Sequence, residues 1–206
     1  MFLYLAYRPF LFFINLFLYF KYPKLILVNV ASFLLEIFHV YSRVQTTSYS
    51  SELTYGEMSY FSVWTCIKSL KGYSFSECID LGSGMGKPLI FMSMILNSKF
   101  KGIEISPQYV DMSKRLISLL NIKFVDIVMG DMSGFEVKGP SLMFFSATCL
   151  EPLTIKKLTS RFLTLEKGSV VVSISQKVGH ESFKLLFKLR LPMSWGYATV
   201  FIQQRC

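Results

Sequence analysis

Apolar residues recur at two different spacings along the chain, and these spacings predict helices and strands in turn. In residues 57–70 apolar side chains return at helical spacing, and Gly72 supplies a stop signal. The short apolar segment 77–81 then predicts a strand, and PLIFMSMIL predicts a helix over about residues 87–97. A second strand, within FKGIEI, is predicted to end at Glu104.

The same alternation continues through the next seventy residues or so. Ser106 and Pro107 form a cap and first-turn pair, which predicts a helix to about residue 120. The segments that follow are predicted as strand, strand, helix and strand: KFVDIVMG, SLMFFSA, PLTIKKLTSRFLTL and SVVVSIS. Strands that alternate with helices predict right-handed crossovers and a parallel sheet covered on both faces.

The end of the chain changes period. Apolar residues in 182–191 alternate with polar ones at a period of two, which predicts a strand rather than a helix. Residues 192–196 then predict a turn and 197–203 a last strand. A mostly parallel sheet that finishes in a hairpin resembles the class I S-adenosylmethionine (SAM) methyltransferases. We therefore expect an α/β fold with a seven-stranded, Rossmann-like sheet and a C-terminal antiparallel hairpin.

The first forty residues are strongly apolar and raise the question of a membrane. The run FLFFINLFLYF has 11 residues, whereas a helix needs about 20 apolar residues to span a bilayer. Extending it back to Met1 encloses Arg8 and Pro9, and a second apolar segment covers residues 25–35. Two interpretations remain open: an imperfect membrane anchor or hairpin, and a helical extension packed on the domain. No small-residue cleavage site of a secretory signal follows the run.

Membrane association is the favoured interpretation, because a soluble extension would have to hide about ten aromatic residues against a small domain. We therefore divide the chain into an N-terminal hydrophobic extension, residues 1–50, and a methyltransferase-like domain, residues 51–206. Residues 1–35 are expected to contact the membrane, with the catalytic domain on the cytoplasmic side. If the N-terminus packs on the domain instead, the expected location is the cytoplasm.

Net charge and cysteine spacing give only weak information on which partners or metals the protein binds. The formal net charge is +9, which suits anionic partners such as nucleic acid or lipid headgroups, or simply a solvated surface. No aromatic residues interleave with the basic ones, so there is no strong signal for nucleic acid. The four cysteines lack metal-type spacing and are interpreted as buried thiols, and His39 and His180 are isolated. No metal site is predicted.

The segment ECIDLGSGMGKPLI gives the clearest indication of a ligand-binding site. Gly82, Gly84 and Gly86 lie at the predicted strand-to-helix turn, where open α/β folds bind ligands at the carboxyl edge of the sheet. By themselves these glycines also fit a dinucleotide pyrophosphate site or a tight turn.

Acidic residues at three predicted strand ends favour SAM. Asp80 is placed to attract the positively charged amino-acid part of SAM and would repel a pyrophosphate. Glu104 is placed to accept hydrogen bonds from ribose hydroxyls. Asp131 is placed to accept from the adenine amino group, and Met132 to donate its backbone N–H to the ring. Each acid alone is more often a cap or a solvated loop residue, but the three together indicate one cofactor site.

Further motifs resemble the non-SET histone lysine methyltransferases, the Dot-one family named for disruption of telomeric silencing. LTYGEMSYFSV precedes the glycines, and GIE, GDM, LMFF and SW follow in that family's order, so the resemblance covers about residues 51–202. It implies that Tyr55 and Glu57 close over the methionine end of SAM. A looser resemblance is to small membrane-anchored lysine methyltransferases of energy-transducing membranes, which share the hydrophobic N-terminus. The full predicted cofactor set is Tyr55, Glu57, Asp80, Gly82, Ser83, Gly84, Gly86, Glu104, Asp131 and Met132.

The sequence departs from the Dot-one pattern at the end of the fourth strand. That family has an asparagine pair and an aromatic residue there, whereas this chain has Ser146, Ala147 and Thr148. Candidates for a lysine channel are therefore Tyr55, Ser146 and Thr148, although both hydroxyls also fit ordinary bonds to backbone. Trp195 is a further candidate for this channel, although a core anchor at the hairpin is its favoured interpretation. We expect a protein lysine methyltransferase; the alternatives are a small-molecule or lipid (quinone) methyltransferase at a membrane, and an inactive SAM-binding scaffold.

Overall fold

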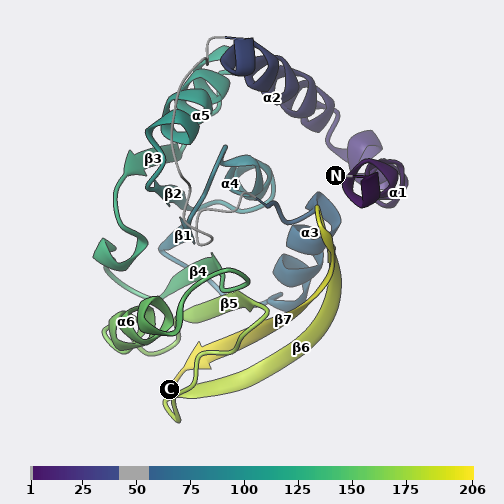
Figure 1. Ribbon diagram of the computed structural model, residues 1–206. Coiled ribbons are helices and arrows are strands. Elements are labelled where there is room, and N and C mark those ends of the chain that lie inside the picture. The colour runs from purple at the N-terminus through teal and green to yellow at the C-terminus, as the bar shows by residue number, and fades with distance from the viewer. Residues whose placement is uncertain (1, 42–55) are drawn as a thin grey trace.

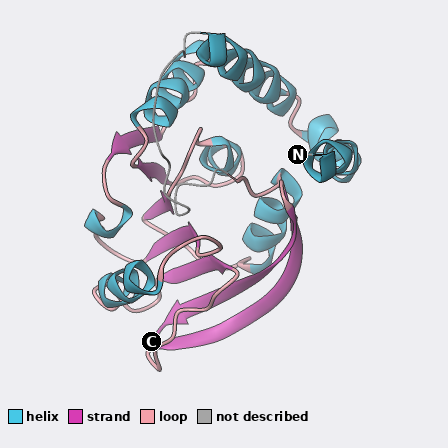
Figure 2. Cartoon of the chain, viewed as in Figure 1, coloured by secondary structure: helices cyan, strands magenta, loops and turns pink. Residues whose placement is uncertain are grey.

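The computed structural model describes the backbone of residues 2–41 and 56–206, and the side chains of residues 9–37 and 56–206. Two long helices come first, α1 (Phe2–Lys21) and α2 (Lys24–Tyr41), and an α/β sheet with its crossover helices follows (Figure 1, Figure 2). The remaining helices are α3 (Tyr60–Ser69), α4 (Lys87–Ser93), α5 (Pro107–Leu119) and α6 (Pro152–Phe162), with a short 3-10 helix at Met132–Gly134. The strands are β1 (Glu77–Leu81), β2 (Lys99–Glu104), β3 (Val125–Met129), β4 (Ser141–Ser146), β5 (Val170–Ile174), β6 (Phe183–Met193) and β7 (Gly196–Arg205).

The seven strands form one sheet in the order β3-β2-β1-β4-β5-β7-β6. Strands β1 to β5 are parallel, and β7 runs antiparallel to both β5 and β6. The predicted α/β fold, with its seven-stranded sheet and C-terminal hairpin, is therefore confirmed. The chain order reverses between β1 and β4, which places the carboxyl ends of β1, β2 and β4 at the edge where such sheets bind ligands.

Two element boundaries differ most from the sequence prediction: α4 ends at Ser93 rather than at about residue 97, and α3 begins later than predicted. That helix begins at Tyr60 rather than at residue 57, because the Ser59 hydroxyl caps it by accepting from the Ser62 N–H at 3.1 Å. Residues before the cap instead run extended, and Met58 forms an antiparallel bridge with Met193 of β6. The segment predicted as the start of a helix is thus held against the C-terminal hairpin.

Two hydrophobic clusters cover the two faces of the sheet. The larger cluster joins one face to α3, α4 and α5, and the other packs α6 through Leu158 and Phe162 against the opposite face. Burial raises the pKa of the Cys66 and Cys78 thiols to about 12, as expected for inert core cysteines. Cys149 and Cys206 are exposed, so the interpretation of all four as buried thiols was wrong for these two, which lie beyond β4 and at the end of β7.

The N-terminal helices pack on the domain. Leu18 and Leu25 are fully buried in the larger cluster, together with residues of the sheet. Val28 of α2 is fully buried against Met112 and Leu116 of α5. Figure 1 shows α2 lying beside α5, and α1 near α3. The domain boundary predicted at residues 50 and 51 falls outside the described residues.

The outer faces of these helices carry apolar side chains into solvent. Over residues 24–37 of α2, whose side chains the structure describes, the exposed positions recur at helical spacing and are all apolar: Ile26, Leu27, Val30, Phe33, Leu34 and Ile37. Across residues 2–41 and 56–206, none of the helices combines the length and apolar character that a membrane span requires.

Candidate cofactor and active site

The glycine turn, residues 82–86, joins the carboxyl end of β1 to the start of α4. Gly82, Gly84 and Gly86 have φ angles of 82°, 52° and 71°, which are left-handed values that side chains other than glycine rarely adopt. Ile103 O of the neighbouring strand β2 accepts the N–H groups of Gly82 and Ser83 at 2.8 and 3.1 Å. The turn therefore curls over the carboxyl edge of the sheet, where a ligand can approach its backbone.

Two buried carboxyl groups lie beside this turn. Burial, with a smaller contribution from the nearby Glu104 charge, raises the pKa of Asp80 to about 7. Glu104 at the end of β2 is fixed by backbone donors, since its Oε2 accepts from the Gly84 N–H at 2.7 Å and its Oε1 from the Ser106 N–H at 2.8 Å. The buried Ser83 Oγ has no hydrogen-bond partner among the described residues. An uncompensated hydroxyl of this kind suits a site that a ligand completes.

Asp131 lies beyond the end of β3, as predicted, and its carboxylate is already engaged. Its Oδ1 accepts from the N–H and the hydroxyl of Ser133, both at 2.8 Å, and its Oδ2 pairs with Lys157 Nζ at 3.0 Å. The Ser133 backbone bond comes first among the contacts that lower the pKa of Asp131 to about 2. It thus caps the 3-10 helix that begins at Met132, and contacts of Asp131 and Met132 with adenine stay a prediction.

Residues 56–58 form one side of the site and are held by the turn between β6 and β7. The Glu57 N–H donates to Ser194 Oγ at 2.9 Å, and the Ser194 N–H donates to Glu57 O at 2.8 Å. A Cβ added at Gly56 would overlap the ring of Trp195, so the YGE motif requires its glycine for this close approach. The Glu57 carboxylate pairs with Lys87 Nζ of α4 at 2.7 Å. Tyr55 lies outside the described residues.

These groups converge on a small pocket of about 50 Å³ above the glycine turn. Its lining includes Asp80, Ser83, Glu57, Ser146 and Trp195. Trp195 is 38% exposed, so the expectation that it anchors the core was wrong. Its ring covers Gly56 because β6 and β7 bring their connecting turn back to the edge of the sheet. The alternative interpretation of Trp195, as a residue of the lysine channel, stays a prediction.

A row of three hydroxyl groups leads outward from the small pocket, beyond the ends of β4 and β5. Ser146 Oγ and Thr148 Oγ1 lie 3.1 Å apart, and Thr148 Oγ1 lies 2.9 Å from Ser175 Oγ. Ser146 lines the small pocket, whereas Thr148 is exposed one hydroxyl further out. Ser175, which sequence reasoning missed, has a left-handed φ of 72°. The structure thus brings both predicted hydroxyl residues together, joined to each other by side-chain contacts.

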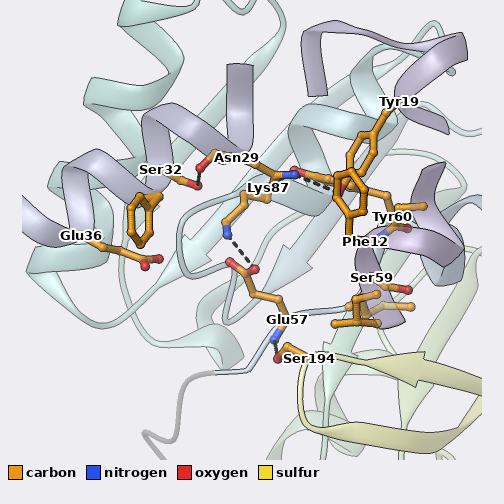
Figure 3. A pocket seen from close by; sticks show the side chains of 14 residues that line it. Phe12, Tyr19, Asn29, Ser32, Glu36, Glu57, Ser59, Tyr60, Lys87 and Ser194 are labelled. Carbon is orange, nitrogen blue, oxygen red and sulfur yellow. Dashed lines mark hydrogen bonds and ion pairs between the residues drawn. The ribbon is translucent and has the colours of Figure 1, made fainter. Parts of the chain in front are cut away.

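A larger pocket of about 260 Å³ lies between the N-terminal helices and the starts of α3 and α4 (Figure 3). Its walls hold a fixed polar network: Asn29 Nδ2 donates to Tyr19 OH, and Tyr60 OH donates to Asn29 Oδ1, each at 3.0 Å. The large pocket shares Glu57 and Met58 with the small pocket. Sequence reasoning missed this pocket, because polar residues such as Asn29 inside apolar helices gave no indication of what they face.

Comparisons with known proteins place the fold. No family model matches the sequence, and no curated protein does. An RNA methyltransferase from Salinibacter ruber, crystallised with S-adenosyl-L-homocysteine, superposes with a TM-score of 0.57 at 21% identity, covering 69% of this chain and 89% of its own. TrmN from Thermus thermophilus superposes with a TM-score of 0.62 at 10% identity, covering 76% of this chain and 52% of its own.

A third similar structure is that of a geranyl diphosphate C-methyltransferase from Streptomyces coelicolor, solved with Mg²⁺, a geranyl diphosphate analogue and S-adenosyl-L-homocysteine. Its TM-score is 0.58 at 12% identity, and the match covers 70% of this chain and 75% of its own. The names of these three proteins give no support to the Dot-one family in particular. The chain therefore has the Rossmann-like fold of the class I SAM-dependent methyltransferases.

Proposed function

We propose that the protein is a SAM-dependent methyltransferase whose acceptor is a lysine side chain of another protein. One observation carries the proposal: the left-handed glycine turn is flanked by buried Asp80 and Glu104 at the ends of β1 and β2. This arrangement occurs in a fold whose structural neighbours were crystallised with S-adenosyl-L-homocysteine.

The residues present fit this cofactor. Each oxygen of Glu104 accepts one backbone N–H in the structure, and each retains acceptor capacity for a ribose hydroxyl. Asp80 lies where its carboxylate would pair with the ammonium of the methionine part, which would favour the ionised form of the acid. The Ser83 hydroxyl, which has no hydrogen-bond partner in the described part of the chain, would gain one from the cofactor. Glu57, and Tyr55 by resemblance, would cover the methionine end.

SAM would supply a methyl group already activated on a sulfonium, so the chain has mainly to align the acceptor. A lysine must first lose its proton, and a pocket that excludes water assists by disfavouring the charged amine. Ser146 Oγ, which lines the small pocket, would accept a hydrogen bond from that amine, and its contact with Thr148 Oγ1 would hold its orientation. A neutral amine held in this way would keep its lone pair free for the methyl group that SAM supplies.

The cofactor part of the proposal is tested by titrating SAM into the full-length protein by calorimetry. Gly84→Arg fills the approach to the turn and Glu104→Ala removes the ribose acceptor, so each should weaken binding by at least about tenfold. Asp111→Asn, which removes one carboxylate from the exposed surface of α5, is the matched control and should bind normally. Failure of the folded protein to bind SAM would overturn the proposal.

The acceptor is tested with methyl-labelled SAM in a host lysate. Label that appears in protein, as methyllysine by mass spectrometry, supports the lysine proposal. Label that partitions into organic solvent would support the alternative of a lipid or other small-molecule acceptor, which the exposed apolar faces of α1 and α2 favour. SAM binding with no transfer into either fraction would indicate a scaffold that keeps the cofactor site only.

A further inference from the structure

We infer that the outer edge of β6 binds an extended, acidic segment of the protein substrate, which adds to the sheet as one more strand. This inference rests on the proposed function, because it takes the methyl acceptor to be a lysine of another protein. It assigns the recognition of that protein to β6, the strand that ends next to the small pocket.

Strand β6 lies at the end of the sheet. The strand order places β7 on one side of β6 and no described strand on the other. Figure 1 shows β6 as the outermost strand on its side of the molecule. A strand in this position presents backbone N–H and C=O groups to which another chain can pair, and extended peptides are bound in this way by several classes of domain.

The segment 57–62 shows which backbone groups of β6 face this edge. The Ser194 N–H and the Pro192 carbonyl both bond to this segment, at 2.8 and 2.6 Å. In an antiparallel pair the backbone groups of alternate residues face the same edge, and no register shift interrupts this part of β6. The N–H and C=O groups of Arg190 and Lys188 therefore face outward too, toward an incoming strand.

The side chains along this edge are positively charged. Lys184, Lys188 and Arg190 are exposed, and residues 182–206 contain no aspartate or glutamate. Among residues 9–37 and 56–206, whose side chains the structure describes, no carboxylate pairs with any of these three cations. Opposite charges on neighbouring strands stabilise a sheet. The edge therefore favours an acidic partner.

Apolar side chains of β6 alternate with these cations. Lys188 and Arg190 share one face of the strand, and Phe187 and Leu189 share the other. Phe187 is 39% exposed, so its ring can still bury surface against a partner. A segment in which acidic and apolar residues alternate would thus place carboxylates beside the cations and apolar side chains beside Phe187.

The same charges disfavour a second copy of this chain as the occupant. Two β6 edges paired with each other would bring Lys188 and Arg190 of one copy close to those of the other, and like charges on neighbouring strands are destabilising. Lysine on an edge strand commonly protects against pairing of this kind. An acidic segment avoids the repulsion.

The position of the edge connects it to the candidate active site. Strand β6 ends at the turn that holds residues 56–58, and Trp195 of this turn lines the small pocket together with Asp80 and Ser146. A segment paired along β6 would therefore lead toward that pocket. A lysine that follows the acidic segment would be delivered to the side of the cofactor site.

Fluorescence anisotropy with a labelled peptide in which glutamate alternates with valine tests the inference on the full-length protein. This peptide should bind saturably. Two related peptides should bind on the order of tenfold more weakly. One has glutamine in place of glutamate and lacks the charge, and the other is methylated on every backbone nitrogen and cannot donate to a strand.

Charge reversal on the protein is the complementary test. Lys188→Glu combined with Arg190→Glu should weaken binding of the acidic peptide by at least about tenfold, and should create binding of a peptide in which lysine alternates with valine. Lys114→Glu combined with Lys123→Glu is the matched control. It makes the same change of net charge at exposed positions near β3, at the opposite end of the sheet, and should bind the acidic peptide as the wild type does.

Equal binding of the three glutamate and glutamine peptides, or an equal loss in the two double variants, would overturn the inference. Tighter binding of single-stranded oligouridine than of the acidic peptide would assign the cations to nucleic acid, and a wild-type dimer that charge reversal at residues 188 and 190 dissolves would assign the edge to a second copy. Either result would overturn it too. If that variant does not fold, the peptides on the wild type still decide. Normal SAM binding without peptide binding rejects this edge alone, whereas failure to bind SAM overturns the proposed function.

Discussion

Asp80 makes the folding stability of the ligand-free protein depend on pH. Its pKa is raised to about 7 by burial and then by Glu104, so the folded state holds a proton that the unfolded chain has lost above about pH 4. Stability contributed by this group therefore falls as pH rises from about 4 to 7. We expect Asp80→Asn to raise the melting temperature relative to wild type more at about pH 8 than at about pH 5, and to abolish SAM binding. A pH-independent difference in melting temperature would contradict the burial argument.

Gly56 provides a second test at single-residue scale. A methyl group there would overlap the Trp195 ring, so Gly56→Ala should cost about 1 to 3 kcal/mol of unfolding free energy. Denaturant unfolding of Gly56→Ala, Trp195→Ala and the double variant forms a double-mutant cycle, and Trp195→Ala should suppress most of that cost. Additive effects of the two changes would show that the ring does not constrain residue 56.

At this scale the sequence predicted the positions of candidate residues where a strand end dictated them, and their contacts with SAM stay a prediction. Asp80 and Glu104 were placed correctly because parallel strands deliver their carboxyl ends to one edge. Trp195 was misjudged because its position depends on how the β6–β7 turn packs against the edge of the sheet. Ser175 was missed because its position depends on how the chain leaves β5. That information is not local to either residue.

Helices α1 and α2 are unusual among the elements because each has one apolar face against the domain and another apolar face in solvent. Leu18 and Leu25 are fully buried, so Leu18→Ala or Leu25→Ala should cost about 2 to 5 kcal/mol in unfolding free energy. Phe20 lies in α1, as Leu18 does, but its side chain is 81% exposed. Phe20→Ala should therefore lower the unfolding free energy far less. Equal, small effects in chemical denaturation would mean that these helices do not share the core of the sheet.

Hydrophobic periodicity predicted the strands and most helices of residues 56–206 closely, because a sheet buried on both faces leaves continuous apolar runs. It failed before α3, where Ser59 competes for the helix start and Met58 pairs with Met193. For α1 and α2 periodicity was uninformative, since nearly every position is apolar. Only packing against α3 and α5 distinguishes their inner faces from their outer ones.

For the molecule as a whole, we propose that the outer faces of α1 and α2 lie on an anionic bilayer surface. The exposed stripe of α2 is entirely apolar over residues 26–37, and Lys21 and Lys24 flank the turn between the helices. Helices of this kind lie in the interface, and lysines there pair with acidic headgroups. The large pocket would then open beside the membrane.

Sedimentation with vesicles containing phosphatidylserine tests this placement. The double variant Leu27→Asp and Leu34→Asp should lose most binding, because charges on the outer stripe resist insertion. Leu119→Asp, a like change at a 67% exposed position of α5, should bind as the wild type does. If the proteins sediment equally, or if the stripe instead forms a dimer without lipid, the bilayer is not its partner.

The contacts around residues 56–62 also bear on how the protein matures. Glu57 is bonded to Ser194 across 137 positions of sequence, and Ser62 Oγ donates to Pro192 O at 2.6 Å across 130. During synthesis the YGE motif therefore emerges long before the hairpin that fixes it, and contacts of such long range form slowly. In a chain still attached to the ribosome the glycine turn could form, but residues 56–58 would not yet be held beside it by the β6–β7 turn. The competence to bind a ligand should thus appear in a single late step, only after residue 195 has left the exit tunnel.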